Sequence, residues 1–345
     1  MGHNEQPLDQ GTAVVVVNPI KTTDLPGLIA TVSRAATTAG LPVPRFMETT
    51  PDDPGTGQAR EALAAGASAV IAAGGDGTVR AVASALCGSG VAMGIIPLGT
   101  GNLLARNLAL PLGDLGGCAR IALTAPAVPL DLGWLTLDDD GESSSGRADG
   151  ARQPTPGGTG AGEREVDPVV GREHAFLVIA GIGFDAEMVE GADDGLKKRL
   201  GWLAYFFVAL GKLFSRRMLV QVGVDGTERV EPFRARSVMV ANTGSLPGGI
   251  VLAPDAAPDD GWLDVLALDT RAGLIGWTSL GVKVLAQGVG IRGRSDAVSM
   301  ITSKRGRTFR VRASRPEPVQ VDGEWLGRAA GFRARVDAGA LRVRK

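Results

Sequence analysis

Hydrophobic positions in the first 127 residues alternate between short apolar runs and stretches with helical spacing. The runs predict strands at residues 13–17, 44–48, 70–73 and 92–96, and the first of them is continuously apolar, as in buried parallel strands. Apolar residues spaced along one helical face predict helices at residues 25–36, 58–65, 79–86, 103–108 and 115–123. Strands that alternate with helices predict right-handed βαβ units, and therefore an open α/β sheet over residues 11–127.

From residue 128 onwards, strand patterns follow one another without long helices between them. The strands are predicted at residues 130–137, 175–180, 219–224, 237–242, 263–268, 299–302, 308–313 and 319–321. This series predicts a mostly antiparallel second domain, a β-sandwich or a barrel, over residues 128–324. Residues 138–167 are rich in Gly, Ser, Asp and Pro, and they are predicted to form a flexible insertion without a core of its own.

The bulk composition narrows the class of protein. A chain of 345 residues with 44% hydrophobic residues fits about two domains, each with its own core. A net charge of −1 and only 4% aromatic residues argue against nucleic acid as a partner. Cys87 and Cys118 are the only cysteines and lie far apart, which favours a reduced, cytoplasmic protein. No apolar segment reaches the roughly 18–20 residues of a spanning helix, so a soluble or membrane-surface protein is predicted.

Two glycine turns carry the main chemical signal. The first, Gly74–Thr78, stands between a predicted strand and a predicted helix, where free backbone N–H groups can bind an anion. Its single carboxylate, Asp76, would repel phosphate unless a cation lay between them, which suggests a nucleotide bound with a divalent metal. The second turn, Gly99–Asn102, also follows a strand, and the carboxyl ends of parallel strands share one edge of a sheet. Tight βα connections explain most single glycine turns, but two on one edge favour phosphate binding.

Two acidic motifs are weaker signals. Asp322–Glu324 and Asp260-Gly261 both contain Asp-Gly, the dipeptide most typical of hairpin turns, so a turn explains them by spacing alone. Several acids and glycines precede Asp260 in the same loop, and such loops supply the oxygen ligands of hard cations. Asp260 is therefore favoured as part of a cation site.

Three other features limit the chemistry. Gly181–Ala186 has the spacing of a dinucleotide fingerprint, but the expected ribose-binding acid is missing, and a structural turn that orients Asp185 is preferred. His3 and His174 are the only histidines, which excludes a histidine-based metal site or triad. Any general base must therefore be a carboxylate.

Residues 196–217 combine a cluster of aromatic and aliphatic residues with basic flanks. One interpretation is a helix packed on the second domain with its charges in solvent. The other is an interfacial helix attracted to anionic lipid, and the sequence leaves both open.

Together these motifs resemble the diacylglycerol kinase catalytic-domain family. The matching segments are Asn18-Pro19, Gly74–Thr78, Pro97–Asn102, Gly181–Ala186, Ala253–Val265 and Asp322–Glu324. They lie in the family's order over nearly the whole chain, whereas the first glycine motif alone is shared with NAD kinases and phosphofructokinases. The chain is most similar to the soluble bacterial lipid kinases, which are related to sphingosine kinase.

The resemblance implies a nucleotide-binding open sheet of the NAD-kinase/phosphofructokinase type, a C-terminal β-sandwich domain, and an active site between them. It implies that residues 325–345 return to the first domain. It implies ATP contacts at Asn18, Pro19, Thr49 (or Thr50), Gly74, Gly75, Asp76, Gly77, Thr78, Val79, Arg80, Ala81, Gly99, Thr100 and Asn102. It implies Mg²⁺ held by Asp260 with backbone oxygens of Ala257 and Trp262. The expected catalytic residues are Glu324, as the base for the lipid hydroxyl, and Asp76.

Three positions depart from the family pattern. Arg80 and Ala81 stand where Asn and Glu are usual, and Leu103 stands where an acid is usual. These changes are expected to alter how the ribose or a bridging water is held. Arg80 is expected to add positive charge near the phosphates.

The sequence therefore predicts an ATP- and Mg²⁺-dependent kinase that phosphorylates the hydroxyl of a diacylglycerol-like lipid. The protein is expected to be cytoplasmic or peripheral on the inner face of the membrane, and a homodimer is left open. Two alternatives remain: a kinase of a soluble substrate such as NAD or a sugar phosphate, and a non-catalytic nucleotide-binding regulator. The presence of Glu324 argues against the regulator.

Overall fold

The fold comes from a computed structural model that describes residues 11–138, 171–183, 217–227, 231–246, 250–269 and 299–345. Three interpretations therefore lie largely outside the described residues: the flexible insertion, the turn at Asp185 and the helix at 196–217. Among the described residues, no helix is long and apolar enough to cross a bilayer.

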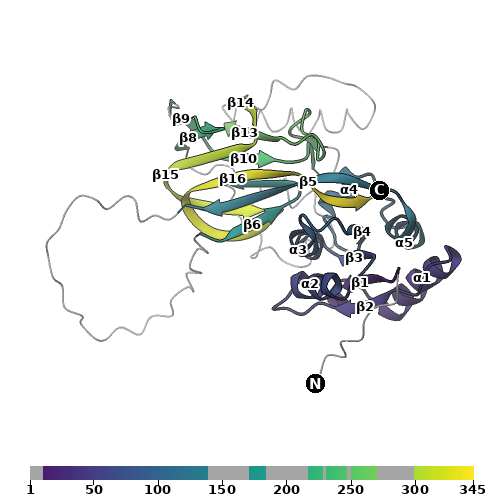
Figure 1. Ribbon diagram of the computed structural model, residues 1–345. Helices are drawn as coiled ribbons and strands as arrows, with labels where there is room; N and C mark the ends of the chain where they lie inside the picture. The colour runs from purple at the N-terminus through teal and green to yellow at the C-terminus, as the bar shows by residue number, and fades with distance from the viewer. Residues whose placement is uncertain (1–10, 139–170, 184–216, 228–230, 247–249, 270–298) are drawn as a thin grey trace, which may run out of the picture.

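The N-terminal part is a parallel sheet covered by helices on both faces (Figure 1). The strands are β1 (Ala13–Val17), β2 (Arg45–Glu48), β3 (Ala69–Gly74) and β4 (Ala92–Pro97), in the order β2-β1-β3-β4. The helices are η1 (Pro19–Lys21), α1 (Leu25–Thr38), α2 (Thr56–Ala64), α3 (Asp76–Leu86), α4 (Leu103–Asn107) and α5 (Leu115–Thr124). The predicted open α/β sheet is confirmed.

Alternate residues of β1 show why this sheet is buried on both faces. Val15 packs in one hydrophobic cluster with α1 and α5, whereas Val14 and Val16 pack in another with α2 and α3. Because successive side chains of a strand point to opposite faces, a continuous apolar run is what a doubly covered strand requires.

The C-terminal part is made almost wholly of antiparallel strands. They are β5 (Ala127–Leu137), β6 (Glu173–Phe176), β7 (Ile179–Ile182), β8 (Met218–Val224), β9 (Phe233–Ala235), β10 (Ser237–Ala241), β11 (Ser245–Leu246), β12 (Ile250–Val251), β13 (Leu263–Asp269), β14 (Ser299–Gly306), β15 (Thr308–Val321) and β16 (Glu324–Arg344). The predicted single strand at 175–180 is two strands, because the backbone turns at Leu177 and Val178. Large side chains such as Phe176, Phe309 and Phe332 fill a core of its own.

Strand β16 joins the two parts into one sheet. It pairs antiparallel with β15 and β5, and its end pairs parallel with β4 at Arg342 and Val343. Residues 325–345, which the sequence predicts to return to the first domain, form nearly all of this strand. The described residues thus contain a sheet of fourteen strands that runs through both parts.

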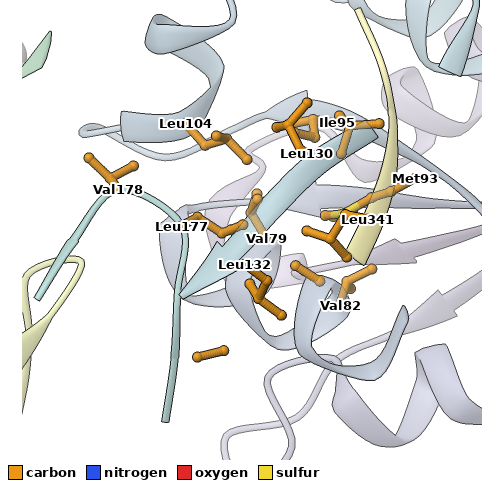
Figure 2. Close-up of a cluster of buried hydrophobic side chains, with 14 of the residues drawn as sticks. Val79, Val82, Met93, Ile95, Leu104, Leu130, Leu132, Leu177, Val178 and Leu341 are labelled. Atoms are coloured by element: carbon orange, nitrogen blue, oxygen red, sulfur yellow. The ribbon is translucent and has the colours of Figure 1, made fainter. Parts of the chain in front are cut away.

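A hydrophobic core lies where the two parts meet (Figure 2). The residues labelled there come from α3, α4, β4, β5, β16 and the turn before β7: Val79, Val82, Met93, Ile95, Leu104, Leu130, Leu132, Leu177, Val178 and Leu341. The core fixes α3 of the first part against the second, and this junction positions the candidate site.

Candidate functional site

The first glycine turn connects β3 to α3. Gly74 has no room for a side chain, because a Cβ there would lie 2.7 Å from the Thr78 side chain. Gly75 is the N-cap of α3 and has no side chain that could accept a hydrogen bond from the helix. The first backbone N–H groups of α3 can therefore donate hydrogen bonds to an anion. Asn18, after β1, donates its amide to Thr78 Oγ1 (3.4 Å), and Pro19 opens η1 beside it. The turn therefore has the form of an anion cradle.

The second glycine turn follows β4 and lies against the first. Leu98 N donates to Gly74 O (2.8 Å), and a Cβ on Gly99 would be only 2.7 Å from the Cα of Gly75. Asn102 is in the left-handed region (φ 48°), and its side chain closes the turn with Gly99 through hydrogen bonds of 3.0 and 2.6 Å. The two turns that the sequence places on one edge are thus in backbone contact.

Asp76 clamps these turns together. Its Oδ2 accepts from Asn102 N (2.9 Å) and its Oδ1 accepts from Leu103 N (2.5 Å). Burial raises the pKa of Asp76, and the nearby Asp322 carboxylate raises it further against these backbone hydrogen bonds. Since each oxygen holds a backbone N–H, the geometry makes Asp76 a positioning residue. Direct catalysis by Asp76 stays a prediction.

The Asp322–Glu324 motif forms the turn between β15 and β16. Asp322 is in the left-handed region (φ 48°), in agreement with the hairpin interpretation. Its carboxylate also accepts from the backbone N–H groups of Leu177, Val178 and Ile179 at 2.8–2.9 Å. Burial raises the pKa of Asp322, and the positive charge of Arg80 acts in the opposite direction. The turn is thus anchored to the start of β7, while the Glu324 side chain is 59% exposed.

Arg80, at the start of the second turn of α3, connects this helix to the Asp322–Glu324 motif. Its Nη1 donates to Val321 O (2.9 Å), and its Nη2 forms an ion pair with Glu324 Oε2. The same oxygen lies 4.0 Å from where a Cβ on Gly77 would be. Glu324 therefore stands over the N-terminal turn of α3, beside the two glycine turns, although it is 244 residues from Arg80 in sequence. The sequence indicates a charge at Arg80 but not its partner.

The other predicted nucleotide residues lie at or near the same edge. Thr49 follows β2, and its N–H donates to Val17 O (2.9 Å), so it stands beside the end of β1. Thr100 is exposed within the second turn. Val79 and Ala81 are buried in the first turns of α3, and Val79 packs in the core of Figure 2, so their side chains are not available to a ligand.

The residues predicted to hold Mg²⁺ lie between β12 and β13. Asp260 Oδ1 accepts from Trp262 N (3.0 Å), and Asp260 Oδ2 is 3.2 Å from Arg305 Nη1. Within the described ranges, no group of three or more His, Cys, Asp or Glu side chains could hold a metal ion. With one oxygen bound to Trp262 N and the other to Arg305, Asp260 does not fit a divalent ion shared with the carbonyls of Ala257 and Trp262 while Arg305 is in place. The metal assignment stays a prediction.

A cavity of about 880 Å³ lies elsewhere, on the second part of the protein. Its lining includes Arg310 and Arg312 of β15, Arg333 and Arg335 of β16, and Trp134 of β5. None of the predicted nucleotide, base or metal residues lines it. The candidate site consequently rests on the contacts of the glycine turns and Glu324, and not on this cavity.

Comparisons with known proteins identify the family and agree with the fold. The family model of the diacylglycerol kinase catalytic domain matches residues 12–135, and that of the YegS C-terminal NAD kinase beta sandwich-like domain matches residues 178–345. A Pseudomonas aeruginosa protein named "Probable lipid kinase YegS-like" is 32% identical over 82% of this chain and 78% of its own length. An uncharacterized Synechocystis protein is 29% identical over 76% of this chain. The chain covers about half (51%) of the length of that relative. A solved diacylglycerol kinase structure from Bacillus anthracis has a TM-score of 0.67 at 19% identity, with 97% and 96% of the two chains covered, and this likeness concerns the fold.

Proposed function

The chain belongs to the family of YegS-like lipid kinases with a diacylglycerol kinase catalytic domain, and on this premise we propose that it transfers the γ-phosphate of ATP to the hydroxyl of a diacylglycerol-like lipid. One observation carries the proposal: the Glu324 carboxylate stands over the N-terminal turn of α3, where the two glycine turns meet. A carboxylate beside a turn suited to anions supports this proposal, because phosphorylation of a hydroxyl gains from a nearby base that accepts its proton.

In this proposal the glycine turns bind the phosphates of ATP. The uncapped N–H groups of α3 and the backbone N–H groups of Thr100 and Gly101 donate hydrogen bonds, and the glycines let the phosphates approach the backbone. Asn18 and Thr49 stand beside them at the ends of β1 and β2. Arg80 adds a positive charge next to the negative charge that develops on the phosphates. In P-loop enzymes a lysine supplies this positive charge.

Glu324 would accept the proton of the lipid hydroxyl as that oxygen attacks the γ-phosphorus, and the bond from this phosphorus to the bridging oxygen of ADP breaks so that ADP leaves. Its side chain is 59% exposed, so a hydroxyl can reach it, and Arg80 holds its carboxylate toward α3. Mg²⁺ would enter with ATP and neutralise phosphate charge. A lipid acceptor also implies work at a membrane surface, and we propose peripheral contact with the inner face for that reason.

The test uses radiolabelled ATP, Mg²⁺ and vesicles of a bacterial lipid extract, with NAD and sugar phosphates in parallel reactions. We expect label in the organic phase and not in the soluble products. Glu324→Gln should lower this rate by about 10²–10⁴-fold without loss of ATP binding. The matched control is Glu61→Gln, because Glu61 forms only a surface ion pair with Arg45 (3.2 Å).

Two outcomes would contradict the proposal. Label found only in NAD or a sugar phosphate would assign a soluble substrate. A Glu324→Gln variant with the wild-type rate would remove Glu324 as the base, whereas ATP binding without transfer to any acceptor would favour a regulator.

A further inference from the structure

The acidic loop between β12 and β13 is the site where the family resemblance implies Mg²⁺. Asp255, Asp259 and Asp260 lie within six consecutive residues of it, and Asp264 follows on β13. Carboxylates gathered in this way repel one another unless a cation is close. A cation is therefore expected close to these carboxylates.

Arg305 of β14 already lies among these oxygens. In the antiparallel register it is directly opposite Asp264, and its Nη2 and Nε lie 3.2 and 3.4 Å from the two Asp264 oxygens. Its Nη1 is 3.2 Å from Asp260 Oδ2, and its Nη2 also donates to the backbone carbonyl of Asp255. One guanidinium thus joins two carboxylates and a loop carbonyl, a donor set that resembles what a hard cation would gather.

Two further carboxylates nearby, Asp131 and Asp259, have partners of their own. Asp131 of β5 accepts from Gly261 N (2.6 Å) and Gly339 N (2.7 Å), which ties the loop to β5 and β16. Asp259 Oδ2 is 3.9 Å from Lys345 Nζ. The loop is therefore cross-linked to three strands by groups of the chain itself.

We propose that the Arg305 guanidinium takes the place of a divalent ion in this loop, so that the loop is built without metal. Asp264 is only 5% exposed, and a charge so deeply buried needs a partner within hydrogen-bond distance. Arg305 meets that need with a planar fork that a hydrated Mg²⁺ ion would have to displace. On the proposed function, the kinase would then need Mg²⁺ only as the counter-ion of ATP.

The test measures thermal unfolding in excess EDTA, in Mg²⁺ and in Ca²⁺, without nucleotide or lipid. We expect the wild-type melting temperature to be the same in all three. Arg305→Ala should melt roughly 4–8 °C lower in EDTA, because two carboxylates lose their partner, and part of the loss should return with Ca²⁺. The matched control is Arg307→Ala, because the Arg307 guanidinium stacks on the Trp262 ring (5.0 Å to the centroid) and forms no ion pair with these carboxylates among the described residues.

Two results would overturn the proposal. One is a wild-type melting temperature that rises with Mg²⁺ or Ca²⁺ and no longer rises in Asp260→Asn. The other is an Arg305→Ala protein that melts like wild type in EDTA. If Arg305→Ala does not fold, calorimetric titration of Ca²⁺ into wild type decides: no saturable binding supports the proposal, and binding that Asp260→Asn abolishes overturns it. Lipid phosphorylation is not measured, so failure here leaves the proposed activity standing.

Discussion

Asp76→Asn tests whether the carboxylate between the glycine turns acts through the backbone or through a cation. In the structure, one carboxylate oxygen accepts from Asn102 N at 2.9 Å and the other from Leu103 N at 2.5 Å. Asparagine has nearly the same shape but only one acceptor oxygen, and its NH₂ group would face a backbone N–H. One hydrogen bond is lost, and a donor is left against a donor.

The expected cost follows from these contacts. A hydrogen bond to a charged group contributes about 1.5–3 kcal/mol, and a buried N–H without an acceptor costs about 1–3 kcal/mol. Burial already raises the pKa of Asp76, so part of this loss is offset because the variant no longer buries a charge. We expect a net decrease of about 2–4 kcal/mol in the free energy of unfolding, or roughly 3–6 °C in Tm for a chain of this length.

Nucleotide binding gives the sharper measurement. If Asp76 positions the second turn, calorimetric titration should show ATP binding at least about tenfold weaker, which corresponds to about 1.4 kcal/mol. The loss should be equal in EDTA and in Mg²⁺, because the backbone donors are displaced in both. The control is Asp114→Asn, the same change at the N-cap of α5, where Oδ1 accepts from Gly117 N (2.8 Å) and Asn caps equally well.

The reasoning fails if Asp76→Asn binds ATP normally in EDTA and weakly only with Mg²⁺. That pattern would show that Asp76 acts through a bound cation, as the sequence suggests. Wild-type melting together with wild-type binding would refute both interpretations.

Two further predictions concern Asp322 and Asp131, buried carboxylates outside the two glycine turns. Asp322→Asn should lower the free energy of unfolding by about 3–5 kcal/mol, because one amide oxygen cannot replace a carboxylate that accepts three backbone N–H bonds; an unchanged urea midpoint would contradict this. Burial is the main cause that raises the pKa of Asp131 in the folded protein. Its contribution to the free energy of unfolding is therefore complete below the unfolded pKa of about 3.9. This contribution decreases as the pH rises through the higher pKa of the folded protein. The stability deficit of Asp131→Asn should therefore shrink from acidic to neutral pH, and melting curves whose separation stays constant with pH would count against it.

The sequence was sufficient to predict those features for which a local hydrophobic pattern and a rule of sheet topology agree. Apolar runs and helical spacing identify β1, β3 and β4, and parallel strands bring their carboxyl ends to one edge. For that reason the two glycine turns could be placed side by side, and the contact between Gly75 and Gly99 agrees with this.

What the sequence missed are long-range contacts between single side chains. Nothing in the spacing joins Arg80 to Glu324, or Asp322 to the backbone of residues 177–179, since these pairs are more than 140 residues apart. The error at 175–180 has the same origin. The backbone N–H groups of residues 177–179 donate to the Asp322 carboxylate. The strand is interrupted there, so the apolar run that predicts one strand forms two.

The position of Glu324 depends on one strand that belongs to both parts of the molecule. Glu324 begins β16, and about twenty residues later Arg342 and Val343 pair with β4, the strand that ends at the second glycine turn. Between these points β16 is paired with β5, and Leu341 is buried in the core that also contains Val82 of α3 (Figure 2). A hinge between the two parts would have to break this pairing and open the shared core. We therefore expect the phosphate cradle and the carboxylate over it to be assembled before substrates bind, with substrate-driven movement restricted to side chains such as Arg80.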